Sequence, residues 1–436
     1  MTTLGARLRE ARLAAGLTQG DLAGEGISAS FVSRIESDVR QPGTEVLRVF
    51  ARRLGVSPDW LRRGTAVGRP PATALEIRDL AEADLAAGDP ESARERLAGL
   101  DPALIPVRHR ASTAVLLSHA QELCGDFEAA RTGLEPLWAE AVADERAEDV
   151  LALTRGLLYL YIVSGRQDVA LRVGTRALAT IAGHEVDPDE RLRVGATLMW
   201  AQIERGDLVH ARQRGRELLA EATAAGSVAG RAAVLWNLSS TEMESGRFDR
   251  ARRYAGSAVE LMGDGPGARG RDFFRARLHY GSTALHGEDA AIEVALDQLS
   301  AARSGLAVLG GPVDLVTLDV EHSRAHLLLG DLAEAERWAE SALGHGVQPA
   351  PAWQVQAMIA LADVLMAGRR TAAARDLCQQ ASGVLEAAGD TRESAALWRA
   401  LGGRLHLGGA SEAASRAYDR ALSAAGLRPR RSASRA

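Results

Sequence analysis

One short pattern recurs through most of this chain: a glycine, usually followed by a polar residue, stands five positions before an alanine. The full copies are Gly88/Ala93, Gly125/Ala130, Gly165/Ala170, Gly206/Ala211, Gly246/Ala251, Gly330/Ala335, Gly368/Ala373 and Gly408/Ala413, and Gly287 with Ile292 is a weaker copy. Successive glycines lie 37 to 43 residues apart, a period that indicates stacked pairs of helices. We expect each glycine to end a first helix in a left-handed conformation, and each small alanine to let a second helix cross closely.

The composition supports an all-α fold class. The 436 residues are 46% apolar, but only 4% are aromatic. Ala, Leu and Arg dominate, and these residues favour helices over strands. The two cysteines, Cys124 and Cys378, exclude a disulfide framework. No apolar run approaches the ~20 residues of a membrane span, and the first residues do not resemble a secretory signal. We therefore expect a cytoplasmic protein that makes no membrane contact.

The first 65 residues follow a different pattern from the rest of the chain. Leu4, Leu8, Ala11 and Ala15 form one apolar helical stripe, with Arg7, Arg9 and Arg12 largely off it, and Gly16 ends that helix. Thr18 is suited to cap a short second helix, and Ser28 to cap a third. Two helices joined by a tight, glycine-containing turn form a helix-turn-helix.

The third helix has a distinct outer face. Val32 and Ile35 are spaced to point inward, which leaves Ala29, Ser30, Ser33, Arg34 and Ser37 outside. A fourth helix is predicted over residues 44–54. A fifth begins at Ser57-Pro58 and includes Trp60 and Leu61. The alternative is a small helical bundle with a solvated arginine face and no ligand.

The segments LTQGDLA, GISASFVSRIES and LRVFARRLGVSPDWL resemble the Cro/CI-type helix-turn-helix family, also called the xenobiotic-response-element family. The resemblance covers about residues 4–64. It implies a compact five-helix domain whose third helix enters the major groove of double-stranded operator DNA. One departure is that only two residues separate Ala23 from Gly26, where the family has three, and Gly20 weakens the same helix. We expect a shortened second helix.

The resemblance also assigns roles to individual residues. It places Ala29, Ser30, Ser33 and Arg34 at base-reading positions, with Ser28 beginning that helix, and Thr18, Gln19 and Arg40 at phosphate contacts. It matches Arg12 and Glu36 to a buried ion pair. The chemistry agrees, because arginine pairs with guanine, alanine contacts the thymine methyl, and Thr, Gln and Arg donate to phosphates.

We divide the chain into a helix-turn-helix domain (1–65), a linker stiffened by Pro70-Pro71 (66–75), a repeat domain (76–426) and a basic, disordered tail (427–436). Residues 1–64 hold ten arginines against seven acidic residues, and the last ten residues add four arginines. The total net charge is −5, so the part between carries about −12. The basic ends thus contrast with an acidic repeat domain.

The turns GDFEAA and GDLAEA resemble the tetratricopeptide repeat. The resemblance covers about residues 76–425, with a period longer than the usual 34. It implies a right-handed superhelix whose concave face is lined by the first helix of each pair and binds peptides or protein partners. Leu117, Leu157, Leu198 and Leu238 stand eight residues before a repeat glycine, and we expect them to pack inside each pair.

Helix geometry predicts which residues face that groove, because positions ten, nine and six before each glycine share one face. These positions hold Arg155, Trp236, Arg277, Trp398, Asn237, Glu321, His119, Tyr159, Trp200 and Arg324. Asn can bond a peptide backbone through both amide groups, and Trp supplies a flat contact area. From this set we predict a ligand site of Arg155, Tyr159, Trp200, Trp236, Asn237, Arg277 and Arg324. The alternative is that these rings only pack between repeats.

No cofactor or catalytic constellation emerges from the sequence. His322 and His326 lie four apart, but no third ligand is evident, so we predict core histidines and no metal site. We predict a homodimeric bacterial transcription regulator, not an enzyme, whose repeats sense a small effector, a peptide being favoured. Its domain order resembles that of peptide-sensing quorum regulators. The alternative is a repeat-based scaffold or adaptor with a vestigial helix-turn-helix domain.

Overall fold

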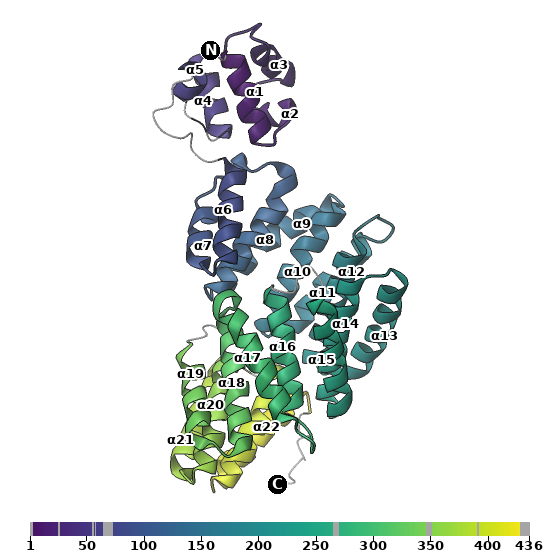
Figure 1. The fold of residues 1–436 in the computed structure, drawn as a ribbon, viewed down its shortest axis with the longest axis vertical. Helices are drawn as coiled ribbons and strands as arrows, with labels where there is room; N and C mark the ends of the chain where they lie inside the picture. Colours follow the sequence, from purple (N-terminus) through teal and green to yellow (C-terminus); the bar gives the residue numbers. More distant parts are fainter. Residues whose placement is uncertain are drawn as a thin grey trace, which may run out of the picture. The chain divides into compact units, whose positions relative to one another are not determined.

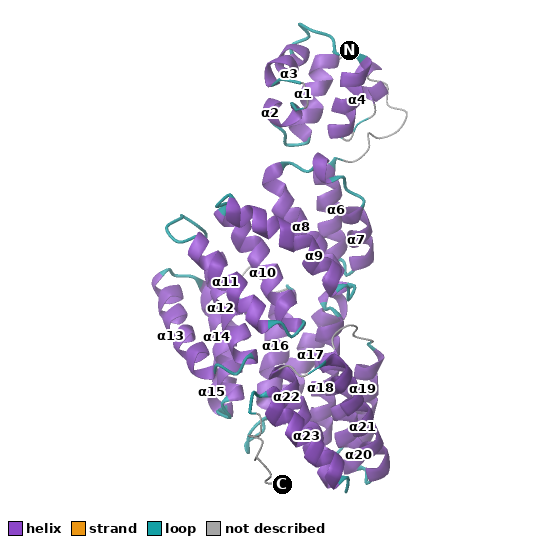
Figure 2. Ribbon diagram, turned by 180° about the vertical axis from the view of Figure 1, so that it is seen from behind, coloured by secondary structure: helices purple, strands orange, loops and turns teal. Residues whose placement is uncertain are grey.

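The computed structural model describes residues 3–24, 27–54, 56, 58–63, 73–264, 270–345, 351–389 and 392–427. Within these ranges the elements are helices, which confirms the all-α prediction (Figures 1 and 2). Most of the predicted linker and all but Leu427 of the predicted tail lie outside the described residues. No described helix is long and apolar enough to cross a membrane.

Five short helices form the N-terminal domain, as the sequence predicts. They are α1 (Leu4–Ala14), α2 (Gln19–Leu22), α3 (Ala29–Glu36), α4 (Thr44–Arg53) and α5 (Pro58–Arg63). Leu8, Leu22, Ile35, Phe50 and Leu61 are fully buried between them. The helices therefore share one apolar core, which fixes the orientation of α3.

The second helix is a single turn, as the missing residue in this segment predicts. Ala23 already has an extended backbone, so α2 stops at Leu22. Gly24 and Ile27 then exchange two backbone hydrogen bonds of 3.0 and 2.9 Å. Arg53 donates to the Leu22 carbonyl oxygen over 2.8 Å and satisfies an acceptor at this early helix end.

The rest of the chain consists of helix pairs. The contacts of the whole chain divide it into two compact units, and the boundary lies between Gln121 and Glu122. The first unit continues with α6 (Ala74–Ala86), α7 (Pro90–Ala98), the 3₁₀ helix η1 (Pro102–Leu104) and most of α8 (Val107–Leu123). Helix α6 begins at Ala74, two residues before the predicted start of the repeat domain.

The second unit begins with the last turn of α8 and holds the remaining fifteen helices of the described chain. These are α9 (Phe127–Ala143), α10 (Ala147–Val163), α11 (Gln167–Thr180), α12 (Pro188–Glu204), α13 (Leu208–Ala224), α14 (Val228–Glu244), α15 (Phe248–Gly263), α16 (Arg271–Ala284), α17 (Ile292–Leu309), α18 (Pro312–Leu329), α19 (Leu332–Gly344), α20 (Pro351–Ala367), α21 (Thr371–Ala388), α22 (Arg392–Leu407) and α23 (Ser411–Ala424). Within this unit α10 packs on α12 and α12 on α14, and likewise α16 packs on α18, α18 on α20 and α20 on α22. They therefore form one layer of the array.

Seven repeat glycines adopt the predicted left-handed conformation, with φ between 68° and 96°. The last two pairs correct the prediction, because Arg369 and Gly409, rather than Gly368 and Gly408, have positive φ. The buried alanine moves by one residue as well, to Ala374 and Ala414 in place of Ala373 and Ala413. The five-residue spacing is therefore kept, and only the helix end is one residue later.

The repeat leucines also join successive helix pairs. Leu198 and Leu238 are buried, and each lies against a glycine of the preceding helix pair. A Cβ atom on Gly174 would lie 2.4 Å from Leu198 Cδ2, and one on Gly215 would lie 2.5 Å from Leu238 Cδ2. These glycines let α12 and α14 approach α11 and α13 closely.

Candidate functional site

The third helix presents the predicted polar face. Ser28 caps it by accepting a hydrogen bond from the Phe31 amide over 3.2 Å. Val32 and Ile35 are fully buried, so the opposite side of the helix faces outward. That side carries four exposed residues, Ala29, Ser30, Ser33 and Arg34. These four residues therefore face outward, as predicted, and their role in reading bases stays a prediction.

Two arginines on this surface are exposed and form no ion pair among the described residues. Arg34 Nε donates to the carbonyl oxygen of Ser30 over 3.3 Å, within its own helix. The Arg40 guanidinium lies 5.0 Å from the centroid of the Phe31 ring. Both cations keep donors available for an anionic partner.

The helix is braced from behind by an ion pair, which confirms the pairing of Arg12 with Glu36. Arg12 Nη2 donates to Glu36 Oε2 over 2.9 Å, and its Nη1 donates to the Leu17 carbonyl oxygen over 2.8 Å. Burial raises the pKa of Glu36, but the bonds from Arg12 and Gln19 outweigh it and leave that pKa below its usual range. Arg7, expected off the apolar stripe, is instead buried and donates to the Leu61 carbonyl oxygen.

The two expected phosphate contacts in the second helix serve local structure. Gln19 Nε2 donates to Glu36 Oε2 over 2.8 Å, so its amide is part of the brace. Thr18 Oγ1 donates to Asp21 Oδ2 over 2.7 Å and forms a capping box, although it stays exposed. Thr18 thus has a free surface, whereas Gln19 has one donor already engaged.

Gly5 is a determinant that the sequence analysis missed. A Cβ atom there would lie 2.3 Å from the Ile35 carbonyl oxygen, so α1 crosses α3 with no room for a side chain. Asp38, in the left-handed region at φ 56°, accepts a bond from the Gly5 amide over 2.8 Å. The sequence signal for this crossing is a glycine inside an otherwise good helical pattern.

In the repeat domain, three of the predicted groove residues form one cluster. The rings of Tyr159 and Trp200 lie 5.9 Å apart. Arg275, which the sequence analysis did not select, places its guanidinium 5.3 Å from the Tyr159 centroid and 5.7 Å from that of Trp236. We call Tyr159, Trp200, Trp236 and Arg275 the interior cluster. They come from α10, α12, α14 and α16, the layer predicted to line the concave face.

An ion-pair network adjoins the interior cluster. Arg271 binds both carboxylate oxygens of Glu122 over 2.7 Å and donates to Asp314 Oδ2 over 2.7 Å. Tyr159 Oη donates to Glu122 Oε1 over 3.1 Å. Burial opposes ionisation of Asp314, but Arg271 and Arg275 hold its pKa below the usual range. Burial and Glu122 raise the pKa of Tyr159, so the phenol stays a donor.

Arg275 differs from its neighbour Arg271. Its Nε lies 3.1 Å from Asp314 Oδ1, and its Nη1 lies 3.9 Å from Asp272 Oδ1. Its side chain is 21% exposed. A planar cation held between two rings, with unused N–H donors, has the geometry to bind a carboxylate through two bonds.

The other predicted groove residues lie outside the cluster or beside it. Asn237 follows Trp236 on α14 and donates to the Ala233 carbonyl oxygen over 3.0 Å, which leaves its amide oxygen available. Arg155 lies 3.8 Å from Glu190, and Arg324 pairs with Glu321 on its own helix. Arg277 stacks over Phe273 at 5.4 Å. His119 is partly exposed in the first unit.

Trp398 contradicts the groove prediction. It is only 2% exposed and packs in the core shared by α20–α23, because its helix presents an apolar side there. His322 is likewise buried, with Nδ1 2.9 Å from the Leu318 carbonyl oxygen and its ring stacked on Trp338. It is a core residue, as predicted.

The fold and these sites define a helix-turn-helix domain followed by tetratricopeptide-like helix pairs. Residues 8–61 match the helix-turn-helix family model. Three solved structures are similar. A Rap protein in complex with competence and sporulation factor shares 12% identity at TM-score 0.49, covering 97% of each chain. PlcR of Bacillus thuringiensis in complex with the peptide PapR7 and DNA shares 12% at 0.37, covering 65% of this chain and 99% of PlcR. A putative kinesin light chain with tetratricopeptide-like repeats, titled as from Podosopora anserina, shares 17% at 0.38, covering 46% and 97%. No curated protein matches the sequence.

Proposed function

We propose that the protein is a sequence-specific transcription regulator, in which the N-terminal domain binds operator DNA and the repeat domain senses a small effector. The observation that carries the first part is the exposed face of α3. Its small side chains allow close approach to base edges, and Arg34 is an unpaired cation at its centre. An arginine in this position can bond guanine O6 and N7 together.

The interior cluster supports the second part of the proposal. Arg275 offers a carboxylate-binding fork, and the faces of Trp200 and Trp236 offer contact area for an apolar side chain. The free amide oxygen of Asn237 accepts from a backbone N–H group. Together these groups suit a short peptide with a free carboxylate.

The protein acts as a cytoplasmic homodimer in this proposal. One small domain, which carries about +3 charge, makes few contacts with DNA, and a twofold pair doubles them. Effector binding in the array then alters the spacing of the two DNA-binding domains. Small rotations between neighbouring repeats add along the array.

A selection experiment tests this function against that of a scaffold or adaptor. The full-length chain is incubated with sheared DNA of its source genome, and bound fragments are sequenced and footprinted. We expect enrichment of a few sites, lost in Arg34→Ala. Recovery of random fragments, or of none, would overturn the proposal and favour an adaptor whose repeats bind a protein.

A further inference from the structure

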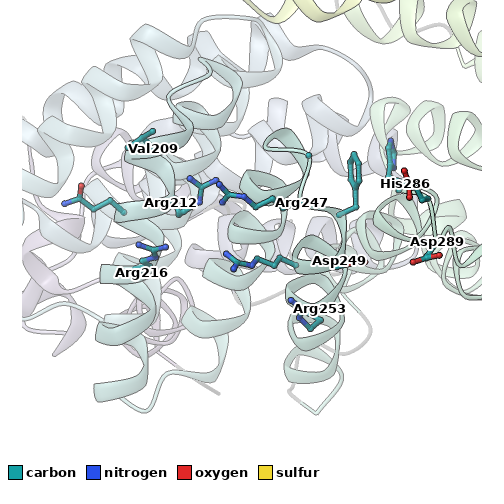
Figure 3. A pocket seen from close by; sticks show the side chains of 14 residues that line it. Val209, Arg212, Arg216, Arg247, Asp249, Arg253, His286 and Asp289 are labelled. Atoms are coloured by element: carbon teal, nitrogen blue, oxygen red, sulfur yellow. The ribbon is translucent and has the colours of Figure 1, made fainter.

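A recess lies in the repeat domain, between the beginnings of α13 and α15 and the turn that follows α16 (Figure 3). Its volume is about 1070 Å³. Five arginines line it: Arg212, Arg216, Arg247, Arg250 and Arg253. We call this recess the arginine trough. None of its lining residues belongs to the interior cluster, so it is a separate site.

The cations of the arginine trough are only partly neutralised. Arg212 and Arg247 share one carboxylate, that of Glu242, at 2.8 and 3.0 Å. Arg216, Arg250 and Arg253 are exposed and form no ion pair within the described part of the chain. Three guanidinium groups therefore face the recess with all their donors unused.

This arrangement is unfavourable without a ligand. Arg247 and Arg250 occupy the start of α15, where the positive end of the helix dipole disfavours cations. The first nine residues of α13 hold three arginines and no acidic residue, in a domain that is acidic as a whole. An anion bound in the trough relieves this repulsion, and it gains charge-assisted hydrogen bonds.

The far side of the trough has a different chemistry. Phe248 and His286 stack there with ring centroids 5.6 Å apart. Glu288 and Asp289, in the turn after α16, line the trough on the same side, and Figure 3 shows Asp289 and His286 at the same end of it; Asp249 lines the trough from α15. A stacked pair of rings accepts a flat base against its edge or face, and carboxylates accept hydrogen bonds from sugar hydroxyls.

We propose that the arginine trough binds a nucleoside di- or triphosphate. The phosphates lie on Arg212, Arg216, Arg250 and Arg253, the base lies against Phe248, and the ribose faces the carboxylates. The volume suits a molecule of this size. Because the cations line the walls of a recess, they favour a small ligand that enters the recess rather than a DNA duplex.

Calorimetric titration of the full-length chain tests this, with ATP, AMP and inorganic triphosphate as probes. We expect ATP to bind more tightly than AMP. The variant R216A–R253A should weaken ATP binding about tenfold or more, since it removes charge-assisted bonds. Neither arginine has a protein partner, so this variant leaves no carboxylate unpaired. The control R172A–R399A removes two exposed, unpaired arginines elsewhere and should change affinity less than twofold.

A second comparison separates a nucleotide from a bare polyphosphate. Phe248→Leu should weaken ATP several-fold and leave inorganic triphosphate unchanged, because only the base contacts that ring. A folding defect would weaken both probes equally. The proposal is overturned if none of the probes binds at millimolar concentration, if R216A–R253A and its control behave alike, or if R216A–R253A impairs only the binding of duplex DNA.

Discussion

Arg271 and Glu122 lie 149 residues apart in the chain and meet in a two-pronged ion pair, with both N–O distances at 2.7 Å. The same guanidinium binds Asp314, so it links the ends of α8, α16 and α18. The space exists because residue 311 is glycine, where a Cβ atom would lie 3.3 Å from Arg271 Nη2. The array therefore curves far enough for distant repeats to touch.

This ion pair should contribute strongly to stability. Arg271→Ala leaves Glu122 and Asp314 buried without their main partner, which typically costs about 3–5 kcal/mol. We expect a lower urea midpoint for the unfolding of the repeat domain, measured by circular dichroism. Arg416→Ala is the control, because its pair with Glu412 is highly exposed and should contribute less than about 1 kcal/mol. Equal effects of the two substitutions would contradict this prediction.

The sequence predicted the features that depend on local spacing. The five N-terminal helices follow from caps such as Thr18 and Ser28, and the helix pairs follow from the repeat glycines. Where two adjacent residues could both end the helix, the repeat pattern does not decide which one takes the left-handed conformation. At the last pair it is Gly409 rather than Gly408. The paired contact of Arg12 with Glu36 came from the family resemblance, which carries three-dimensional information.

The interior site was predictable only in part. Tyr159, Trp200 and Trp236 were predicted from their positions ten or six residues before a repeat glycine. Arg275 lies twelve residues before Gly287, so that rule does not select it. Its placement depends on how far the array curves, which no single repeat specifies. Trp398 satisfies the same count and is buried, because the last pairs pack around it instead of opening onto a groove.

Protonation of His279 should couple stability to pH. Burial lowers its pKa to about 4, with a further contribution from His286. The unfolded state, with a pKa near 6.5, then binds more protons between these values. Stability is therefore full above about pH 6.5 and falls by up to about 3 kcal/mol towards pH 4. His279→Gln should flatten that decline, whereas the same change at exposed His210 should not.

Two arginines should separate base reading from phosphate contact. Arg34→Ala should cost about 1–3 kcal/mol on the cognate site and relax the preference at one base pair. Arg40→Ala should weaken binding to every sequence alike and reduce the salt dependence. Fluorescence anisotropy on a panel of single-base operator variants measures both. Uniform losses in both variants would make Arg34 a phosphate contact.

The operator should be an inverted repeat bound by a dimer. One reading helix per chain and a twofold axis place half-site centres about 34 Å apart, or at a multiple of that distance. Footprinting together with analytical ultracentrifugation of the complex measures the spacing and the number of chains. Full affinity for one unrepeated half-site would contradict the dimer.

The effector response should depend on the interior cluster and the adjacent Asn237, and not on the DNA-binding face. Asn237→Ala removes the proposed backbone contact, and Arg275→Lys keeps the charge but removes the two-pronged geometry. Both should lose the change in operator affinity that an effector causes, about 5–150-fold for a coupling of ~1–3 kcal/mol. Effector-free DNA binding should stay unchanged, because neither residue belongs to the N-terminal domain.

Operator affinity is measured for wild type and both variants, with and without fractionated cell extract and synthetic peptides. Amidated peptides form the matched comparison, because they lack the carboxylate proposed to bind Arg275. Wild type should respond to the free acid and not to the amide, and Arg172→Ala, which removes an exposed arginine outside the predicted ligand site, should respond as wild type does. An equal response to acid and amide would exclude Arg275 as the anchor, and a full response in Asn237→Ala would exclude that residue from the sensor.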